Sequence, residues 1–352
     1  MNPQHIKWIW ISIGISSFFL IALLYFTFDE ATIAALQNLS PTILLIALGF
    51  HIIALVCWAL RIKVMADSLG YRVGFFHCIN LVCANLFLAA ITPSQAGGEP
   101  VRVHELYKAD VKLGDATAVV IMERVLDGIV FGVGGAVMLF LLGTTWQYIH
   151  LPVVVNYLIY ITWFTVTAGV LIFAYSVRNP LILKRLMKAL SHYLTKKWEM
   201  ARVEAFMAKV DREVDNFHFS LGKFIGRGKT GLFLGFIFTA MFWFFEFIIA
   251  SVLLIGLGQG PYFLESFISQ LVIAMIMMIP LTPGGAGVAE LSIGSIYGLF
   301  ISTSVIGVFV LLWRIILYYF NIAVGLVAGL IIVRREVENA ASDDDDQYLH
   351  KT

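Results

Sequence analysis

Residues 279–294 read IPLTPGGAGVAELSIG and place two prolines and four glycines in a chain that is otherwise strongly apolar. A second stretch, ITPSQAGGE at residues 91–99, shares the pattern Thr-Pro-x-x-Ala-Gly. Both residue types interrupt helices, because proline lacks a backbone donor and glycine adopts backbone angles that other residues avoid. The fold of the chain therefore depends on what these two matched breaks do.

The overall composition indicates a membrane protein. The 352 residues are 60% hydrophobic and 13% charged, whereas about a quarter of the residues in a soluble domain are charged. The net charge of +1 argues neither for nor against binding to nucleic acid. The sequence shows no basic patch with interleaved aromatic residues, so we expect no nucleic-acid partner. The sequence contains no P-loop, dinucleotide fingerprint, HExxH, CxxC or GxSxG motif, so we expect no cofactor and no bound metal.

Six apolar runs predict full membrane spans, since each reaches the roughly 20 residues that cross the hydrocarbon core. These runs are 8–28, 41–62, 116–142, 153–175, 231–255 and 304–333. Two further apolar runs, 75–91 and 263–279, each lead into one of the Thr-Pro breaks. We interpret them as the first arms of re-entrant helical hairpins.

The positions of lysine and arginine predict the orientation, because basic loops stay in the cytoplasm. Basic residues flank the run 75–91 on both sides, so the first hairpin is expected to enter and leave on the cytoplasmic side. The flanking residues are Arg61, Lys63 and Arg72 before the run and Arg102, Lys108 and Lys112 after it. No lysine or arginine lies in 230–313, so the second hairpin is expected to enter from outside. We predict a multi-pass protein of the cell membrane with both termini in the cytoplasm.

The surroundings of the two breaks also match. Arg124 lies 32 residues after Thr92 (124 − 92), and Arg314 lies 32 residues after Thr282 (314 − 282). A Leu-Gly pair precedes each break, at residues 69–70 and at residues 257–258. Two copies of span, hairpin and span with opposite orientation form an inverted-topology repeat, as in many secondary transporters.

The predicted fold class is an all-α polytopic membrane protein with about six full spans plus two re-entrant helical hairpins related as inverted-topology repeats. A single transmembrane domain covers 1–333, with repeat one at about 41–142 and repeat two at about 231–333. A cytoplasmic amphipathic segment covers about 178–229, and 334–352 form a disordered acidic tail.

The breaks have a physical use. Irregular backbone at membrane depth must be buried in protein or line a wet cavity. A half-helix that begins at Thr-Pro, with the threonine hydroxyl as its cap, exposes free N–H groups and the positive end of its dipole. That end favours an anion such as phosphate. The alternative is a packing kink, since proline and glycine are common in membrane helices.

Ionisable residues inside predicted spans are costly and usually face the bundle interior or a cavity. Glu123 and Asp127 are four residues apart on one helical face, with Arg124 beside Glu123. Arg314 has no acidic neighbour in sequence. We expect its partner to be Glu290, Glu246 or the charge of a substrate, with an ion pair that only fixes helix register as the alternative. We interpret His51, His77 and Trp58 as packing or interfacial residues.

Three stretches carry a family resemblance: TPSQAGGEPVRVHEL (92–106), ATAVVIMERVLD (116–127) and IPLTPGGAGVAE (279–290). Together they resemble the flippase-like integral membrane family related to the transmembrane region of lysylphosphatidylglycerol synthases, the multiple peptide resistance factors. The resemblance covers about 41–333. It implies a lipid translocator, because this region of the synthases is thought to move the aminoacylated lipid between leaflets. Only 19 residues follow Val333, so we expect a stand-alone member without the synthase domain, and no enzyme.

The family motifs contain nearly the same residues that their spacing and charge also indicate. The predicted substrate-binding residues are Thr92, Pro93, Gly97, Gly98, Glu99, Arg102, Glu123, Arg124, Asp127, Thr282, Pro283, Gly284, Gly285, Gly287, Glu290 and Arg314. We expect them to hold a phospholipid or a polyprenyl-phosphate-linked lipid in a midplane cavity, with the acidic residues pairing with arginines or taking up protons.

Two other functions are compatible with the same residues. A secondary transporter of a small anion would use the same inverted repeat. An intramembrane enzyme acting on a lipid phosphate or a glycosyl lipid would use Glu99 or Asp127 as acid or base. Coupling to a proton or another ion, and a homo-oligomer, are open as well.

Overall fold

The computed structural model describes the chain chiefly in residues 30–37, 39–92, 98–144, 228–277 and 284–349, with Thr282 and isolated residues in 14–26, 157–175 and 219–226. All regular structure in these residues is helical, which confirms the all-α class there. Most residues of the predicted spans 8–28 and 153–175, and of the predicted amphipathic segment 178–229, lie outside the described residues.

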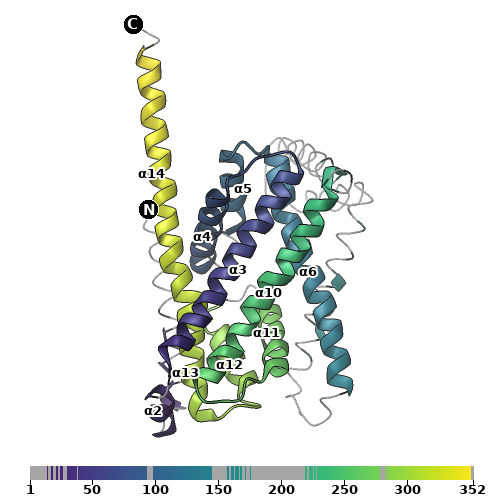
Figure 1. Ribbon diagram of the computed structural model, residues 1–352, viewed down its shortest axis with the longest axis vertical. Coiled ribbons are helices and arrows are strands. Elements are labelled where there is room, and N and C mark those ends of the chain that lie inside the picture. Colours follow the sequence, from purple (N-terminus) through teal and green to yellow (C-terminus); the bar gives the residue numbers. More distant parts are fainter. Residues whose placement is uncertain are drawn as a thin grey trace, which may run out of the picture. The chain divides into compact units, whose positions relative to one another are not determined.

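The described helices follow the apolar runs closely (Figure 1). In chain order they are α2 Glu30–Gln37, α3 Pro41–Ser68, α4 Phe75–Ile91, α5 Gly98–Lys108, α6 Leu113–Thr144, α10 Lys229–Gly256, α11 Phe263–Met277, α12 Val288–Tyr297, α13 Thr303–Arg314, the π-helix η1 Ile315–Tyr319 and α14 Phe320–Leu349. Among the described residues, three helices are long and apolar enough to cross a membrane: α3, α10 and the continuous helix Thr303–Ile332. The six-span count and the inverted repeat stay predictions.

Both Leu-Gly pairs form the same kind of helix end. After α3, Gly70 has a φ of 96°, and the N–H of Tyr71 donates to the carbonyl of Ala66. After α10, Gly258 has a φ of 71°, and the N–H of Gln259 donates to the carbonyl of Leu254. A left-handed glycine with a bond that spans five residues is the Schellman ending. The match seen between the two halves of the sequence therefore extends to local backbone structure.

The chain divides into two compact units. Unit 1 comprises Met1–Ala59, Phe75–Arg102 and Phe244–Thr352, and unit 2 comprises Leu60–Gly74 and Val103–Trp243. The helices α3, α5 and α10 each contribute residues to both units. Each unit contains one of the two buried arginine clusters described below.

In unit 1, α4 lies alongside α14 (Figure 1). The contact is close because α14 presents Gly325: a Cβ atom there would lie 2.5 Å from the carbonyl oxygen of Cys83 and 2.9 Å from the backbone nitrogen of Phe87. Buried Ala84 and Ala328 extend the contact. Small residues let membrane helices approach closely, so this seam is set by side-chain size.

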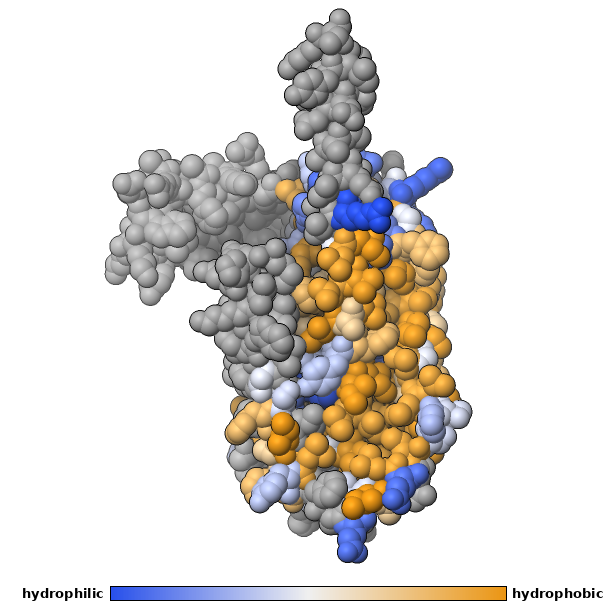
Figure 2. All heavy atoms as spheres, turned by 90° about the vertical axis from the view of Figure 1, so that its left-hand side faces the viewer, coloured by the Kyte–Doolittle hydropathy of each residue, from blue (hydrophilic) through white to orange (hydrophobic). Residues whose placement is uncertain are grey.

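The other side of α14 is exposed and apolar. Figure 2 shows hydrophobic residues covering the face where α14 lies, with hydrophilic residues gathered above and below them. Leu326, Val327, Leu330 and Ile331 on α14 are all exposed. A contiguous apolar surface of this kind suits contact with lipid. The helix itself runs past Val333, the predicted end of the transmembrane domain, because residues 334–349 contain no glycine or proline to end it.

Candidate functional site

The second Thr-Pro break builds a glycine turn that starts α12. Gly284, Gly285 and Gly287 have φ values of 58°, 65° and 83°, a backbone region that favours glycine. The turn delivers the chain to α12, where Glu290 lies in the first turn and its Oε2 accepts the N–H of Gly287 at 2.7 Å. A carboxylate here is stabilised by the positive end of the helix dipole.

Arg314, at the end of α13, completes this site within unit 1. Its Nη2 donates to Glu290 Oε2 at 2.7 Å and to the carbonyl of Gly285 at 3.1 Å. The guanidinium also lies over the ring of Tyr318, 4.8 Å from the ring centre. The side chains of Arg314 and Glu290 are 2% and 1% exposed. The prediction that Glu290 is a partner of Arg314 is confirmed.

Two polar groups at this site have no hydrogen-bond partner among the described residues. Arg314 Nε and Thr282 Oγ1 are buried and make no hydrogen bond to any described residue. Both groups belong to the glycine turn, since Thr282 accepts the N–H of Gly285 through its carbonyl and Arg314 donates to the carbonyl of Gly285. Buried polar groups normally find a partner, so these two donors can bind acceptor atoms in addition to those of Glu290.

A second buried arginine cluster lies in unit 2, around Arg61 on α3. Arg61 donates from Nε to Glu123 Oε1 at 2.9 Å and from Nη1 to Asp127 Oδ1 at 2.7 Å. Thr239 Oγ1 lies 3.3 Å from Nη1, and the indole N–H of Trp243 donates to Asp127 Oδ1 at 3.0 Å. The charged side chains are 1% exposed for Arg61, 0% for Glu123 and 6% for Asp127. Residues on three helices thus satisfy one another.

Two predictions about charge are corrected by this cluster. The sequence predicts Arg61 at the cytoplasmic end of a span that stops at residue 62, but Arg61 lies buried inside α3, which continues to Ser68 because residues 63–68 contain no helix breaker. Arg124 was expected to match Arg314, but its side chain is 45% exposed and lies 3.7 Å from Asp127. Adjacent helical residues point about 100° apart, so Arg124 cannot share the buried face of Glu123.

A third polar group lies in unit 1, where the sequence suggested only packing. His51 on α3 is 1% exposed. Its Nδ1 lies 2.7 Å from Glu246 Oε1 on α10, and its Nε2 lies 2.8 Å from Asn321 Oδ1 on α14. Glu246 therefore pairs with His51, and its prediction as a partner of Arg314 is wrong. His77 contacts Arg335, with 3.0 Å between Nδ1 and Nη1.

The first break is described only at its edges. Thr92 Oγ1 donates back to the carbonyl of Leu88 at 2.7 Å, in the last turn of α4. Its expected role as a helix cap stays a prediction, because residues 93–97 lie outside the described residues. Gly98 begins α5 against Asn85, whose Oδ1 would lie 2.3 Å from a Cβ at position 98. Arg102 is fully buried, 5.6 Å from the ring centre of Trp58. Glu99 lies in the first turn of α5. Pro93, Gly97 and Pro283 lie outside the described residues.

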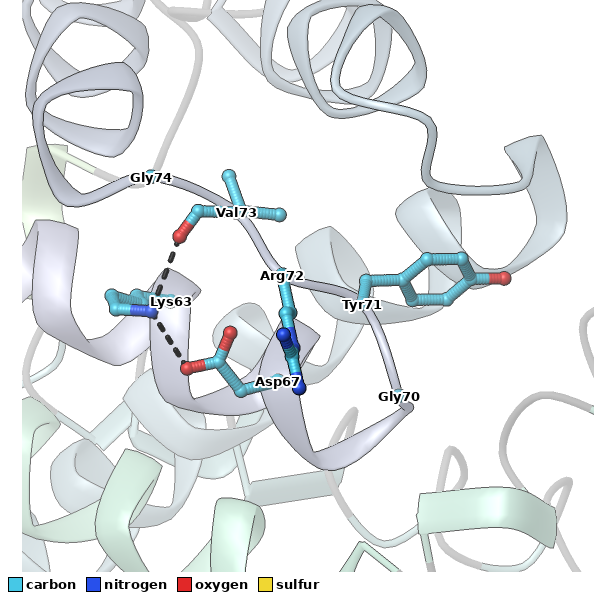
Figure 3. Close-up of a pocket in the computed structure, with 7 residues that line it drawn as sticks. All are labelled: Lys63, Asp67, Gly70, Tyr71, Arg72, Val73 and Gly74. Atoms are coloured by element: carbon cyan, nitrogen blue, oxygen red, sulfur yellow. Dashed lines mark hydrogen bonds and ion pairs between the residues drawn. The ribbon is translucent and has the colours of Figure 1, made fainter.

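Unit 2 also contains a pocket of about 680 Å³ at the turn between α3 and α4 (Figure 3). Lys63 Nζ contacts Asp67 Oδ2 at 2.8 Å and the carbonyl of Val73 at 3.2 Å. Figure 3 shows Arg72 running toward Asp67 while Tyr71 points away. The two basic residues of the pocket, Lys63 and Arg72, thus lie toward the carboxylate of Asp67. The contact between Lys63 and the carbonyl of Val73 stabilises the turn.

The comparisons with known proteins agree on one family. Residues 9–325 match the family model described as the lysylphosphatidylglycerol synthase TM region. A UPF0104 membrane protein of Archaeoglobus fulgidus is 33% identical over 304 residues, covering 86% of this chain and 90% of that protein. One from Methanocaldococcus jannaschii is 25% identical over 331 residues, covering 92% and 94%. The matched region contains all three polar clusters.

Proposed function

Because this chain belongs to the family of the lysylphosphatidylglycerol synthase transmembrane region, we propose that it is a lipid translocase that moves a phosphate-bearing lipid between leaflets. It is a multi-pass membrane protein of helical structure. The family description refers to synthases of a phospholipid, which supports a lipid of that chemistry as the cargo. The observation that carries the proposal is the buried Arg314–Glu290 pair at the start of α12.

In this proposal, the carboxylate of Glu290 occupies the position that the lipid phosphate takes during transport. Its carboxylate accepts hydrogen bonds from a helix N-terminus and from an arginine, the two kinds of donor that bind phosphate in proteins. A phosphate oxygen takes the same position when Glu290 rotates away. The unused N–H of Arg314 and the hydroxyl of Thr282 then supply two further donors. A phosphate, with more acceptor oxygens than a carboxylate, makes fuller use of the site.

The acyl or prenyl tails stay in the bilayer during this exchange. The exposed apolar side chains of α14 provide a surface for them. The head group crosses as the two halves of the repeat rock against each other, as proposed for transporters with inverted repeats. The π-helix η1 directly follows Arg314, and π-helical turns are frequent at functional sites. The movement needs no nucleotide.

Reconstituted vesicles test the proposal. Fluorescent phosphatidylglycerol and a fluorescent polyprenyl phosphate are each quenched from outside, which reports their exchange between leaflets. We expect wild-type protein and Arg334→Ala, an exposed arginine on α14, to accelerate exchange of at least one lipid. Arg314→Ala should abolish that acceleration. No acceleration by wild type over Arg314→Ala for either lipid would contradict the proposal.

The same protein preparations, in vesicles and in detergent, separate the alternatives. Uptake of inorganic phosphate without exchange of any lipid would favour a small-anion transporter. Chemical conversion of the lipid in detergent, where leaflets do not exist, would favour an intramembrane enzyme. Both readouts use the wild-type protein and the Arg314→Ala variant from the same preparations.

A further inference from the structure

The buried group formed by His51, Glu246 and Asn321 has no role in the phosphate site. The three residues come from α3, α10 and α14 of unit 1. Both ring nitrogens of His51 lie within 2.8 Å of an oxygen atom, on Glu246 and on Asn321. His51 is 1% exposed, and the Glu246 side chain is 14% exposed. Ionisable groups this far inside a membrane protein are costly and mark functional pathways.

The geometry fixes the number of protons in the group. Asn321 Nδ2 donates to the carbonyl of Leu317 at 2.8 Å, so its Oδ1 is the atom that faces His51. Nε2 of His51 must therefore carry a proton, because it faces an acceptor. At 2.7 Å, Nδ1 and the carboxylate of Glu246 share a second proton, whichever of them holds it. Without that proton, a ring lone pair would face a carboxylate at hydrogen-bond distance.

We propose that the His51–Glu246 pair is the binding site for a proton whose release and uptake are coupled to transport. The coupling rests on the proposed function, whereas the presence of the shared proton does not. The proton is the ligand, and Asn321 acts as a positioning residue that fixes the ring. Glu246 gives access for the proton, since its side chain is partly exposed.

The surroundings of His51 contain few competing charges. From α10 the facing ionisable group is Glu246, and from α14 the facing side chains are the neutral amide of Asn321 and the ring of Phe320, 5.8 Å away. Among the described residues, no other acidic or basic side chain makes an ion pair with His51. A change of protonation therefore changes the charge of this pair alone.

One continuous helix joins the proton pair to the phosphate site. Arg314 ends α13, Leu317 lies within η1, and Asn321 is the second residue of α14. Loss of the shared proton breaks the contact that holds the His51 ring against Asn321, and Asn321 in turn bonds to Leu317 in the π-helix. A π-helical turn can shift the register of one end of a helix relative to the other. The link between the sites is thus the helical segment from Arg314 to Asn321, which contains the π-helix η1.

A pH gradient across the reconstituted vesicles tests the coupling. The probe is the fluorescent phosphatidylglycerol or polyprenyl phosphate that wild type exchanges. We expect the gradient to change the exchange rate by about fivefold or more in wild type and in His77→Gln, a histidine outside the pair. Glu246→Gln should exchange lipid at a rate that the gradient does not change. Wild-type exchange that is equal with and without the gradient would overturn the inference and leave the proposed function intact.

Nitrogen-15 NMR of the histidine rings tests the shared proton without any transport. His51→Gln identifies the His51 signals by their loss. We expect Nε2 to be protonated, and Nδ1 to be protonated or to show the shift of a strong hydrogen bond to a carboxylic acid. A bare Nδ1 at neutral pH would overturn the proton site even if lipid exchange is observed. If wild type exchanges no lipid, the proposed function and the coupling fall together, and the NMR result still decides the proton site.

Discussion

The two buried arginine clusters differ in how completely they are closed. Arg61 in unit 2 meets two carboxylates, a hydroxyl and, through Asp127, an indole, all from the interiors of long helices. Arg314 in unit 1 meets one carboxylate and one backbone carbonyl, beside a turn of three left-handed glycines. One arginine is enclosed by fixed partners. The other lies at a helix end, and its Nε makes no hydrogen bond to any described residue.

This difference indicates different roles for the two clusters. A buried ion pair whose partners are all fixed by helix packing holds the helices in register. An ion pair formed across a glycine turn can open locally, because glycine tolerates many backbone conformations. We therefore propose that an external phosphate can replace Glu290 at Arg314, whereas it cannot replace Glu123 or Asp127 at Arg61.

The largest expected effect is in the closed cluster. Arg61→Leu leaves Glu123 and Asp127 without their main buried partner, which should cost about 3–5 kcal/mol of unfolding free energy or prevent folding. The measurement is thermal or denaturant unfolding in detergent. Lys63→Leu is the matched control, because Lys63 is partly exposed and its ion pair with Asp67 should contribute about 1 kcal/mol or less. Equal stability of the two variants would remove the distinction between the clusters.

The next effect concerns the packing of α14 against α4, since α14 contains Asn321 and continues the helix that contains Arg314. Gly325→Ala places a methyl group against the backbone of α4, so it should destabilise unit 1 by about 1–3 kcal/mol. Gly329→Ala lies one turn along on the same helix with nothing within 4 Å, so it should be neutral or slightly stabilising. Unfolding curves of both variants check this. A neutral Gly325→Ala would mean that the α4–α14 seam adapts easily.

A smaller effect is expected from Glu290→Gln. The amide can still accept hydrogen bonds from Gly287 and Arg314, so the loss is that of the charge and should be about 1–2 kcal/mol. Unfolding in detergent without added phosphate lipid measures it. A loss as large as that of Arg61→Leu would indicate that this pair is also a fixed structural cluster.

The smallest effect lies at the edge of unit 2. Burial, together with the hydrogen bond to Asp115, raises the pKa of Tyr71 to about 12 from the ordinary value of 10.0. A folded state that keeps this proton is stabilised below the unfolded pKa, and the contribution is lost as pH rises from about 10 to about 12. Tyr71→Phe should show a shallower loss of stability over that interval. Identical pH profiles would show that Tyr71 does not contribute.

Much of the local structure could be predicted from the sequence. The apolar run 75–91 is α4 residue for residue, and the matched Leu-Gly pairs end α3 and α10 in the same way. Glu290 was found as a partner of Arg314 because acidic residues are so rare in this region that few alternatives exist.

The interhelical pairs were harder to predict, because they join residues far apart in sequence. Arg61 meets Glu123 across 62 residues, and His51 meets Asn321 across 270. A single arginine at the end of an apolar run is compatible with a side chain that reaches the membrane surface, and a single histidine is compatible with packing. The one available signal was that apolar residues continue past Arg61 to Met65 and Ala66.

The most direct test compares Glu290→Gln with Glu123→Gln in detergent while phosphate-bearing lipid is added. Both variants remove one negative charge from a buried arginine. We expect phosphatidylglycerol or a polyprenyl phosphate to raise the unfolding temperature of Glu290→Gln, because the lipid phosphate replaces the missing charge at Arg314. The unfolding temperature of Glu123→Gln should stay unchanged beyond the general effect of a diacylglycerol, a lipid without phosphate. Equal responses of the two variants to the phosphate lipid, or no response of Glu290→Gln, would contradict the account.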